Sequence, residues 1–99
     1  MDISVTELKA RLDAEENFIL IDVREPHEHE EFNVGGQLIP VGNIPQALED
    51  FVDHKDDEII VYCRSGNRSG MAQQFLQQYG FSKVRNLIGG MLAWQETFK

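Results

Sequence analysis

The fold of this chain is constrained most by a short apolar run that leads directly into a turn and an amphipathic segment. Residues 59–62 read Ile-Ile-Val-Tyr, a β-branched and aromatic run typical of a strand buried on both faces. Further along, apolar side chains repeat at helical spacing, and a glycine suited to a helix C-terminus follows them: Ala72, Phe75, Leu76, Tyr79 and Gly80. The sequence therefore predicts a strand, a tight turn and a helix that begins near Ser69.

The turn between these two elements contains the only cysteine of the chain, Cys63. It continues as Arg64, Ser65, Gly66, Asn67, Arg68 and Ser69. The small and polar residues allow consecutive backbone N–H groups to point inward, and such a nest at a helix N-terminus binds anions. The two arginines add positive charge to a chain whose formal net charge is −8. We therefore expect Cys63 to be a reactive thiolate with a lowered pKa rather than an inert core cysteine.

Strand and helix signals alternate along the rest of the chain. Residues 4–7 have the pattern of a capping box before a helix, and residues 18–21 form another fully apolar run. A further strand is expected within residues 81–87, and a last helix after the glycine pair at 89–90. The pattern predicts a single α/β domain over residues 1–99, with an open, largely parallel sheet flanked by helices on both faces.

Two segments before the cysteine strand are less regular. An apolar stripe predicts a helix between residues 47 and 52; its members are Ala47, Leu48, Phe51 and Val52. Ahead of it, residues 33–45 contain a glycine pair and two Ile-Pro steps with apolar residues between them. That composition predicts an ordered connection rather than a flexible linker.

Composition excludes several classes of function. With 17 acidic against 9 basic residues, the chain lacks the clustered positive charge that nucleic-acid binding requires. No apolar run is long enough to span a membrane, and residues 1–3 do not begin a secretory signal. We therefore expect a cytoplasmic protein that binds neither membrane nor nucleic acid, and nothing in the sequence suggests an obligate assembly beyond the monomer.

The counts of cysteine and histidine limit cofactors and metals. A single cysteine excludes an internal disulfide, a multi-cysteine zinc site and an internal resolving thiol. His27 and Glu31 are four residues apart, as two metal ligands on a helix would be, but no third ligand is evident nearby. We interpret residues 26–32 as a solvated acidic helical turn and expect neither a metal nor a cofactor.

The segment from Cys63 to Ser69 resembles the active-site loop of single-domain rhodanese sulfurtransferases. Two further segments match that family in the expected order, Ile21–Glu25 near the start and Asn86–Trp94 near the end. The resemblance therefore spans most of the chain. Residues 33–45 depart from it, because many rhodaneses carry a Gly-His-Ile-Pro-Gly-Ala type of segment there.

The resemblance implies a sulfurtransferase in which Cys63 takes a sulfane sulfur from an anionic donor such as thiosulfate and holds it as a persulfide. A nucleophilic acceptor, which could be cyanide, a thiol or another protein, would then remove the sulfur. The loop from Arg64 to Ser69 would bind the anion. Asp22 and Arg24, at the end of an expected strand, would brace the edge of the site without direct chemistry.

Two other functions compete with this interpretation. Cysteine phosphatases and arsenate reductases also place a thiolate between a strand and a helix, but their loops have an arginine at the sixth position after the cysteine. Here Ser69 occupies that position and Arg68 comes one step early, so the loop is one residue short for a phosphate. The second alternative is an interaction module that retains the fold without using the thiol.

Overall fold

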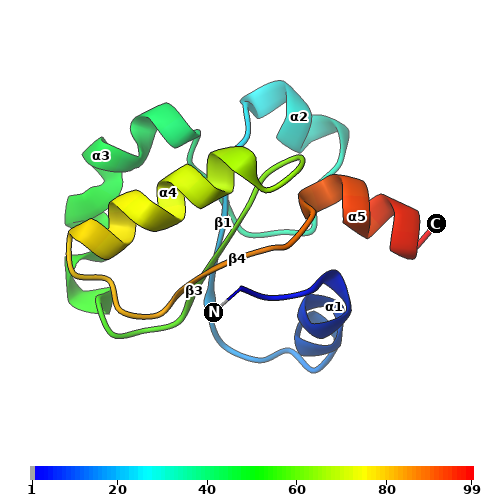
Figure 1. The fold of residues 1–99 in the computed structure, drawn as a ribbon, viewed down its shortest axis with the longest axis horizontal. Coiled ribbons are helices and arrows are strands. Elements are labelled where there is room, and N and C mark those ends of the chain that lie inside the picture. The colour runs from blue at the N-terminus through cyan, green and yellow to red at the C-terminus, as the bar shows by residue number, and fades with distance from the viewer. Residues whose placement is uncertain (1) are drawn as a thin grey trace.

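The protein is described by a computed structural model that covers residues 2–99, built on one four-stranded parallel sheet. The strands are β1 (Ile19–Asp22), β2 (Gln37–Leu38), β3 (Ile59–Tyr62) and β4 (Val84–Asn86). Their order across the sheet is β2-β1-β3-β4, and every neighbouring pair is parallel. The expected α/β fold with a parallel sheet is therefore confirmed (Figure 1).

Helices connect the strands and cover the sheet. The α-helices are α1 (Val5–Asp13), α2 (Pro26–Glu31), α3 (Ile44–Ala47), α4 (Asn67–Gln78) and α5 (Gly90–Thr97). Two 3₁₀ helices, η1 (Val41–Asn43) and η2 (Leu48–His54), flank α3. Within residues 2–99, the length and hydropathy of every helix fall short of what a membrane crossing requires.

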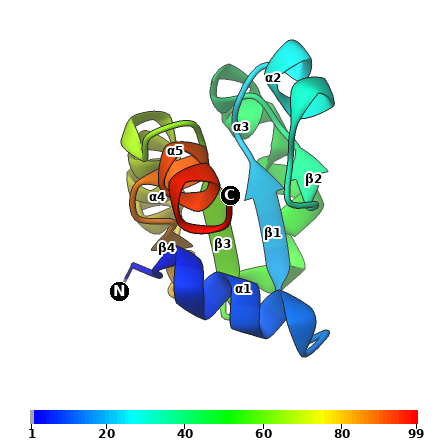
Figure 2. The same ribbon diagram turned by 90° about the vertical axis from the view of Figure 1, so that its right-hand side faces the viewer.

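Two separate apolar cores form on the opposite faces of the sheet. Ile21, Ile59 and Val61 belong to the core under α3, η2 and α4, whereas Leu20 and Ile60 belong to the core under α1 and α5. Figure 2 shows α1 and α5 on the near side of the strands. All four residues of β3 are buried, because helices cover both faces of this central strand.

The structure corrects two local predictions. The predicted helix at 47–52 is a 3₁₀ helix after a short α3, and Val52 is 55% exposed because three residues per turn align Leu48 with Phe51 and direct the next residue outward. The helix after Cys63 begins at Asn67, two residues before the predicted start. The short strand expected within residues 81–87 is present as β4. The connection at 33–45 is ordered and contributes β2.

The connectivity of the sheet explains where a site can form. From the central strands, the chain leaves β1 toward β2 on one side and leaves β3 toward β4 on the other. The ends of the two strands lie side by side, since Asp22 pairs with Tyr62. Loops that diverge from adjacent parallel strands leave a crevice at their carboxyl ends, which is where open α/β sheets bind ligands. Cys63 is the first residue after β3, so it lies at this edge of the sheet.

Candidate active site

The sulfur of Cys63 lies inside a cradle of hydrogen-bond donors. Cys63 is 1% exposed, and the loop after it closes at Gly66, whose φ of 107° lies in the left-handed region. The Gly66 N–H donates to Cys63 Sγ at 3.0 Å, and the Ser69 N–H donates at 3.4 Å. The Ser69 hydroxyl is a third donor, with Oγ 3.3 Å from Sγ. The structure thus brings the middle and the end of the sequence-predicted loop onto the thiol.

These donors determine the charge of the thiol. Burial raises the pKa of Cys63, because a buried thiolate loses its hydration. The Ser69 hydroxyl and the N–H groups of Ser69, Gly66 and Ser65 outweigh that effect, so the net pKa lies below the ordinary cysteine value. Hydrogen bonds from fixed backbone donors therefore stabilise the thiolate at the start of α4.

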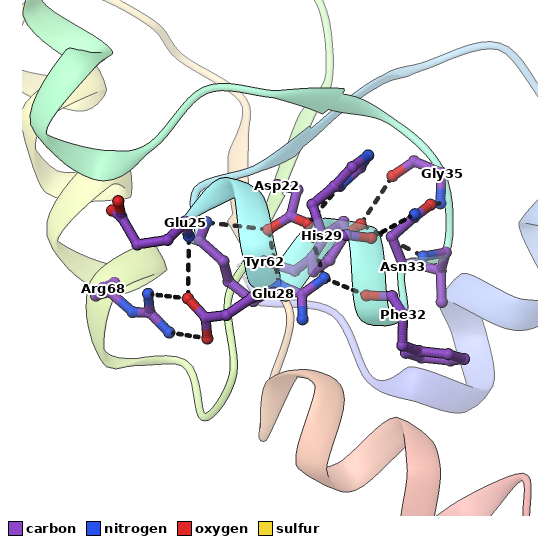
Figure 3. A network of polar contacts seen from close by, with 11 residues as sticks. Asp22, Glu25, Glu28, His29, Phe32, Asn33, Gly35, Tyr62 and Arg68 are labelled. Atoms are coloured by element: carbon purple, nitrogen blue, oxygen red, sulfur yellow. Dashed lines mark hydrogen bonds and ion pairs between the residues drawn. The ribbon is translucent and has the colours of Figure 1, made fainter.

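The two arginines of the loop have different surroundings. Arg68 forms a two-pronged ion pair with Glu28 of α2, at 2.7 Å from Nη1 to Oε1 and 2.9 Å from Nη2 to Oε2 (Figure 3). Arg64 is exposed and forms no ion pair with any other residue of the described chain. It lines a hollow of about 340 Å³ between α2 and α5, together with Phe32 and Leu92. Arg64 is thus the loop arginine whose charge remains available to a ligand.

Glu28 is a site residue that the sequence analysis did not identify. The hydrogen bonds from Arg68 lower its pKa to about 2, against the opposing effect of partial burial. A second contact fixes the start of α2, since the Glu28 carboxylate also accepts from the Glu25 N–H. Glu28 therefore ties the loop after β1 to the helix that follows Cys63.

Asp22 and Arg24 form a buried ion pair beside this contact. Asp22 is fully buried, and Arg24 donates to both of its carboxylate oxygens, from Nε at 2.9 Å and from Nη2 at 2.8 Å. His29 Nδ1 lies 2.8 Å from Asp22 Oδ2 (Figure 3). Arg24 Nη2 also donates to the carbonyl oxygen of Phe32. Burial raises the pKa of Asp22, but the hydrogen bonds from Arg24 and His29 lower it overall. These contacts join the end of β1 to the C-terminal half of α2.

The predicted solvated turn at residues 26–32 is therefore only partly right. Helix α2 has no fully buried residue and begins with Pro26 at its first position, as expected. His29 and Glu28, however, face the molecule and contact Asp22 and Arg68. A helix of six residues is too short for its periodicity to show which side chains point inward.

The glycine pair at 89–90 fits α5 against the Cys63 loop. Gly90 has a φ of 56°, and a Cβ at this position would lie 2.6 Å from the carbonyl oxygen of Arg64. Without that Cβ, the Met91 N–H donates to the carbonyl oxygen of Cys63 at 2.9 Å and the Leu92 N–H donates to that of Arg64 at 2.9 Å. The first turn of α5 therefore supports the backbone of the loop.

Asn86, at the end of β4, contacts the same loop and was also missed as a site residue. Its Nδ2 donates to the carbonyl oxygen of Gly66 at 3.0 Å, and its Oδ1 accepts from Ser69 Oγ at 2.5 Å. Because β4 is the parallel neighbour of β3, the end of β4 lies next to the start of the loop. An amide three residues before the glycine pair at 89–90 was the available signal, but it acquires meaning only once the strand order is known.

Comparison with known proteins identifies the family. The family model of the rhodanese-like domain matches residues 4–97. The Bacillus subtilis protein YtwF, named as a candidate sulfurtransferase, is 40% identical over 99% of this chain and 93% of its own length. YrkF of the same organism, named as a candidate sulfur carrier, is 35% identical over 94% of this chain, which spans about half of that protein. The structure of a human single-domain sulfurtransferase superposes with a TM-score of 0.85 at 26% identity, covering 99% of this chain and 97% of the other. The chain belongs to the rhodanese-like domain family.

The pair between Glu28 and Arg68 predicts a pH-dependent stability. The folded pKa of Glu28, about 2, is below the ordinary value of 4.5, so the pair stabilises the fold fully above about pH 4.5 and loses its effect as the pH falls through 2. Glu28→Gln is therefore expected to lower the free energy of unfolding by about 1 kcal/mol near neutral pH and by progressively less in acid. Urea denaturation across this pH range measures the difference.

The matched control is Glu31→Gln, which changes an exposed glutamate on the same helix. It is expected to leave the free energy of unfolding nearly unchanged at every pH. A loss in Glu28→Gln that stays constant from neutral to acidic pH would show that the ion pair is not its cause.

Proposed function

We propose that this protein is a sulfurtransferase that carries a sulfane sulfur on Cys63 as a persulfide. The main support for the proposal is the environment of the Cys63 sulfur. This buried atom accepts hydrogen bonds from the Gly66 and Ser69 N–H groups and from the Ser69 hydroxyl. Such a sulfur ionises more readily than an ordinary thiol and is oriented before any donor arrives. Membership of the rhodanese-like family and relatives named as sulfurtransferases support the same reaction.

The proposed first step is a displacement at sulfur. The Cys63 thiolate attacks the outer sulfur of thiosulfate, the new S–S bond forms, and the electron pair of the old S–S bond leaves with sulfite. Cys63 then carries a persulfide with one negative charge. In the second step a nucleophile such as cyanide or a thiolate attacks the outer sulfur, and the Cys63 thiolate leaves. Both steps conserve charge without a proton.

The surroundings of Cys63 suit a reaction that needs no general base. Within the described chain, the polar groups that act on the sulfur belong to Ser65, Gly66 and Ser69, and no histidine hydrogen-bonds to it. His29 contacts Asp22, and His54 contacts Asp57 at 2.8 Å. A serine or thiol that must first lose a proton would need such a base, but an existing thiolate does not.

The position of the arginines favours sulfur transfer over phosphatase chemistry. A phosphate-binding loop needs a guanidinium free to clamp the phosphate oxygens. Arg68 is instead neutralised by both carboxylate oxygens of Glu28. Arg64, which lines the hollow, remains available for the charge of an anionic donor. Because Cys63 is 1% exposed, we expect donors that present a narrow terminal sulfur.

Mass spectrometry of the intact protein tests the proposed intermediate. After incubation with thiosulfate, the wild type is expected to gain the mass of one sulfur atom, and cyanide is expected to remove it as thiocyanate. Cys63→Ser, which keeps the size of the side chain, is expected to gain nothing. If thiosulfate leaves no adduct although iodoacetamide labels Cys63, the donor is wrong; if neither reagent reacts, the proposed persulfide chemistry is wrong and a binding module becomes the better interpretation.

The assignment of Arg64 as the anion-binding arginine makes a kinetic prediction. Arg64→Ala is expected to reduce kcat/KM for thiosulfate about tenfold or more, because a charge-assisted contact with the anion is lost. Alkylation of Cys63 by uncharged iodoacetamide is expected to change little. Lys83→Ala, which removes an exposed cation at the amino end of β4, is the matched control. An equal loss of kcat/KM in Arg64→Ala and Lys83→Ala would show that the effect comes from the overall charge of the protein and not from a contact between Arg64 and the anion.

A further inference from the structure

Asn86 touches the Cys63 loop through both ends of its side-chain amide. The carbonyl oxygen of Gly66 can only accept, so the end of the amide that lies 3.0 Å from it must be the nitrogen. The amide oxygen of Asn86 therefore faces Ser69 Oγ, at 2.5 Å. Gly66 thus fixes the orientation of the amide, and Asn86 presents an acceptor to Ser69 rather than a donor.

The Ser69 hydroxyl then has two acceptors and one hydrogen to donate. Asn86 Oδ1 lies 2.5 Å from Oγ, and Cys63 Sγ lies 3.3 Å from it. When Cys63 is a neutral thiol there is no conflict, because its S–H can donate to Oγ while the hydroxyl donates to Asn86. When Cys63 is a thiolate, the sulfur has no hydrogen to give, and it competes with Asn86 for the one hydroxyl hydrogen.

We propose that Asn86 is a positioning residue for Cys63, whose side-chain oxygen competes with the cysteine sulfur for the hydrogen of the Ser69 hydroxyl and so limits the stabilisation of the thiolate. The inference rests on the proposed function, because it concerns the same thiol. It does not assign Asn86 any contact with the transferred sulfur.

Such a limit matters because Cys63 has two opposing tasks. As a nucleophile it attacks the donor sulfur, and a more stabilised thiolate attacks more slowly. As a leaving group it departs from the persulfide, and a more stabilised thiolate leaves faster. The Ser69 hydroxyl, shared between the sulfur and Asn86, sets a compromise between the two steps. The backbone donors, by contrast, cannot be redirected.

The test is the pH dependence of Cys63 alkylation by iodoacetamide, which requires no sulfur donor and stays informative if the proposed transferase activity fails. Asn86→Ala is expected to shift the midpoint of the profile downward by about half a unit to one unit, because Ser69 then donates to the thiolate alone. The reactivity of the fully ionised thiolate is expected to fall at the same time. In a Ser69→Ala background the downward shift is expected to disappear.

A merely structural role predicts the opposite sign. If Asn86 only held the loop in shape, its loss would disturb the Gly66 and Ser69 donors and move the midpoint upward, and an unchanged or raised midpoint in folded Asn86→Ala overturns the proposal. Asn17→Ala, an exposed asparagine before β1, is the control. Should Asn86→Ala not fold, Asn86→Asp serves instead. The aspartate carboxylate is expected to raise the midpoint of Cys63 alkylation more when Ser69 is present than in the Ser69→Ala background. An equal rise in both backgrounds overturns the proposal.

Discussion

The structure depends on the compensation of one buried charge. A thiolate at a position that is 1% exposed loses its hydration, and that loss disfavours ionisation. The N–H groups of Gly66 and Ser69 and the Ser69 hydroxyl replace the lost water. Because the backbone donors belong to a turn that opens directly into α4, they need no rearrangement when the charge appears.

The rest of the site holds that turn in place. From one side, Glu28 pairs with Arg68 and is anchored through α2 to the buried Asp22–Arg24 pair. From the other side, the first turn of α5 donates to the loop carbonyls, which only a glycine at position 90 allows. The supports leave Arg64 as the loop cation without an ion pair in the described chain. Because Glu28 neutralises Arg68, the charge of Arg68 is structural, whereas the charge of Arg64 can contact a substrate.

The sequence predicts the parts of this site that are local along the chain. The strand, the nest and the helix follow one another within about twenty residues, so hydrophobic periodicity and turn residues were sufficient to find them. The partners that complete the site are not local. Glu28 is 40 residues from Arg68, and Asn86 is 17 residues from Ser69. Their roles depend on the strand order, which places the ends of β1, β3 and β4 at one edge of the sheet.

The ionisation of Cys63 in the wild-type protein tests the central claim most directly. The ultraviolet absorbance of the thiolate can be titrated against pH, with Cys63→Ser as the blank, in the folded protein and again in urea. We expect a folded midpoint below the ordinary cysteine value of about 8.5 and a return to that value on unfolding. A folded midpoint at or above the unfolded one would contradict the account, because burial would then outweigh the hydrogen bonds of the loop.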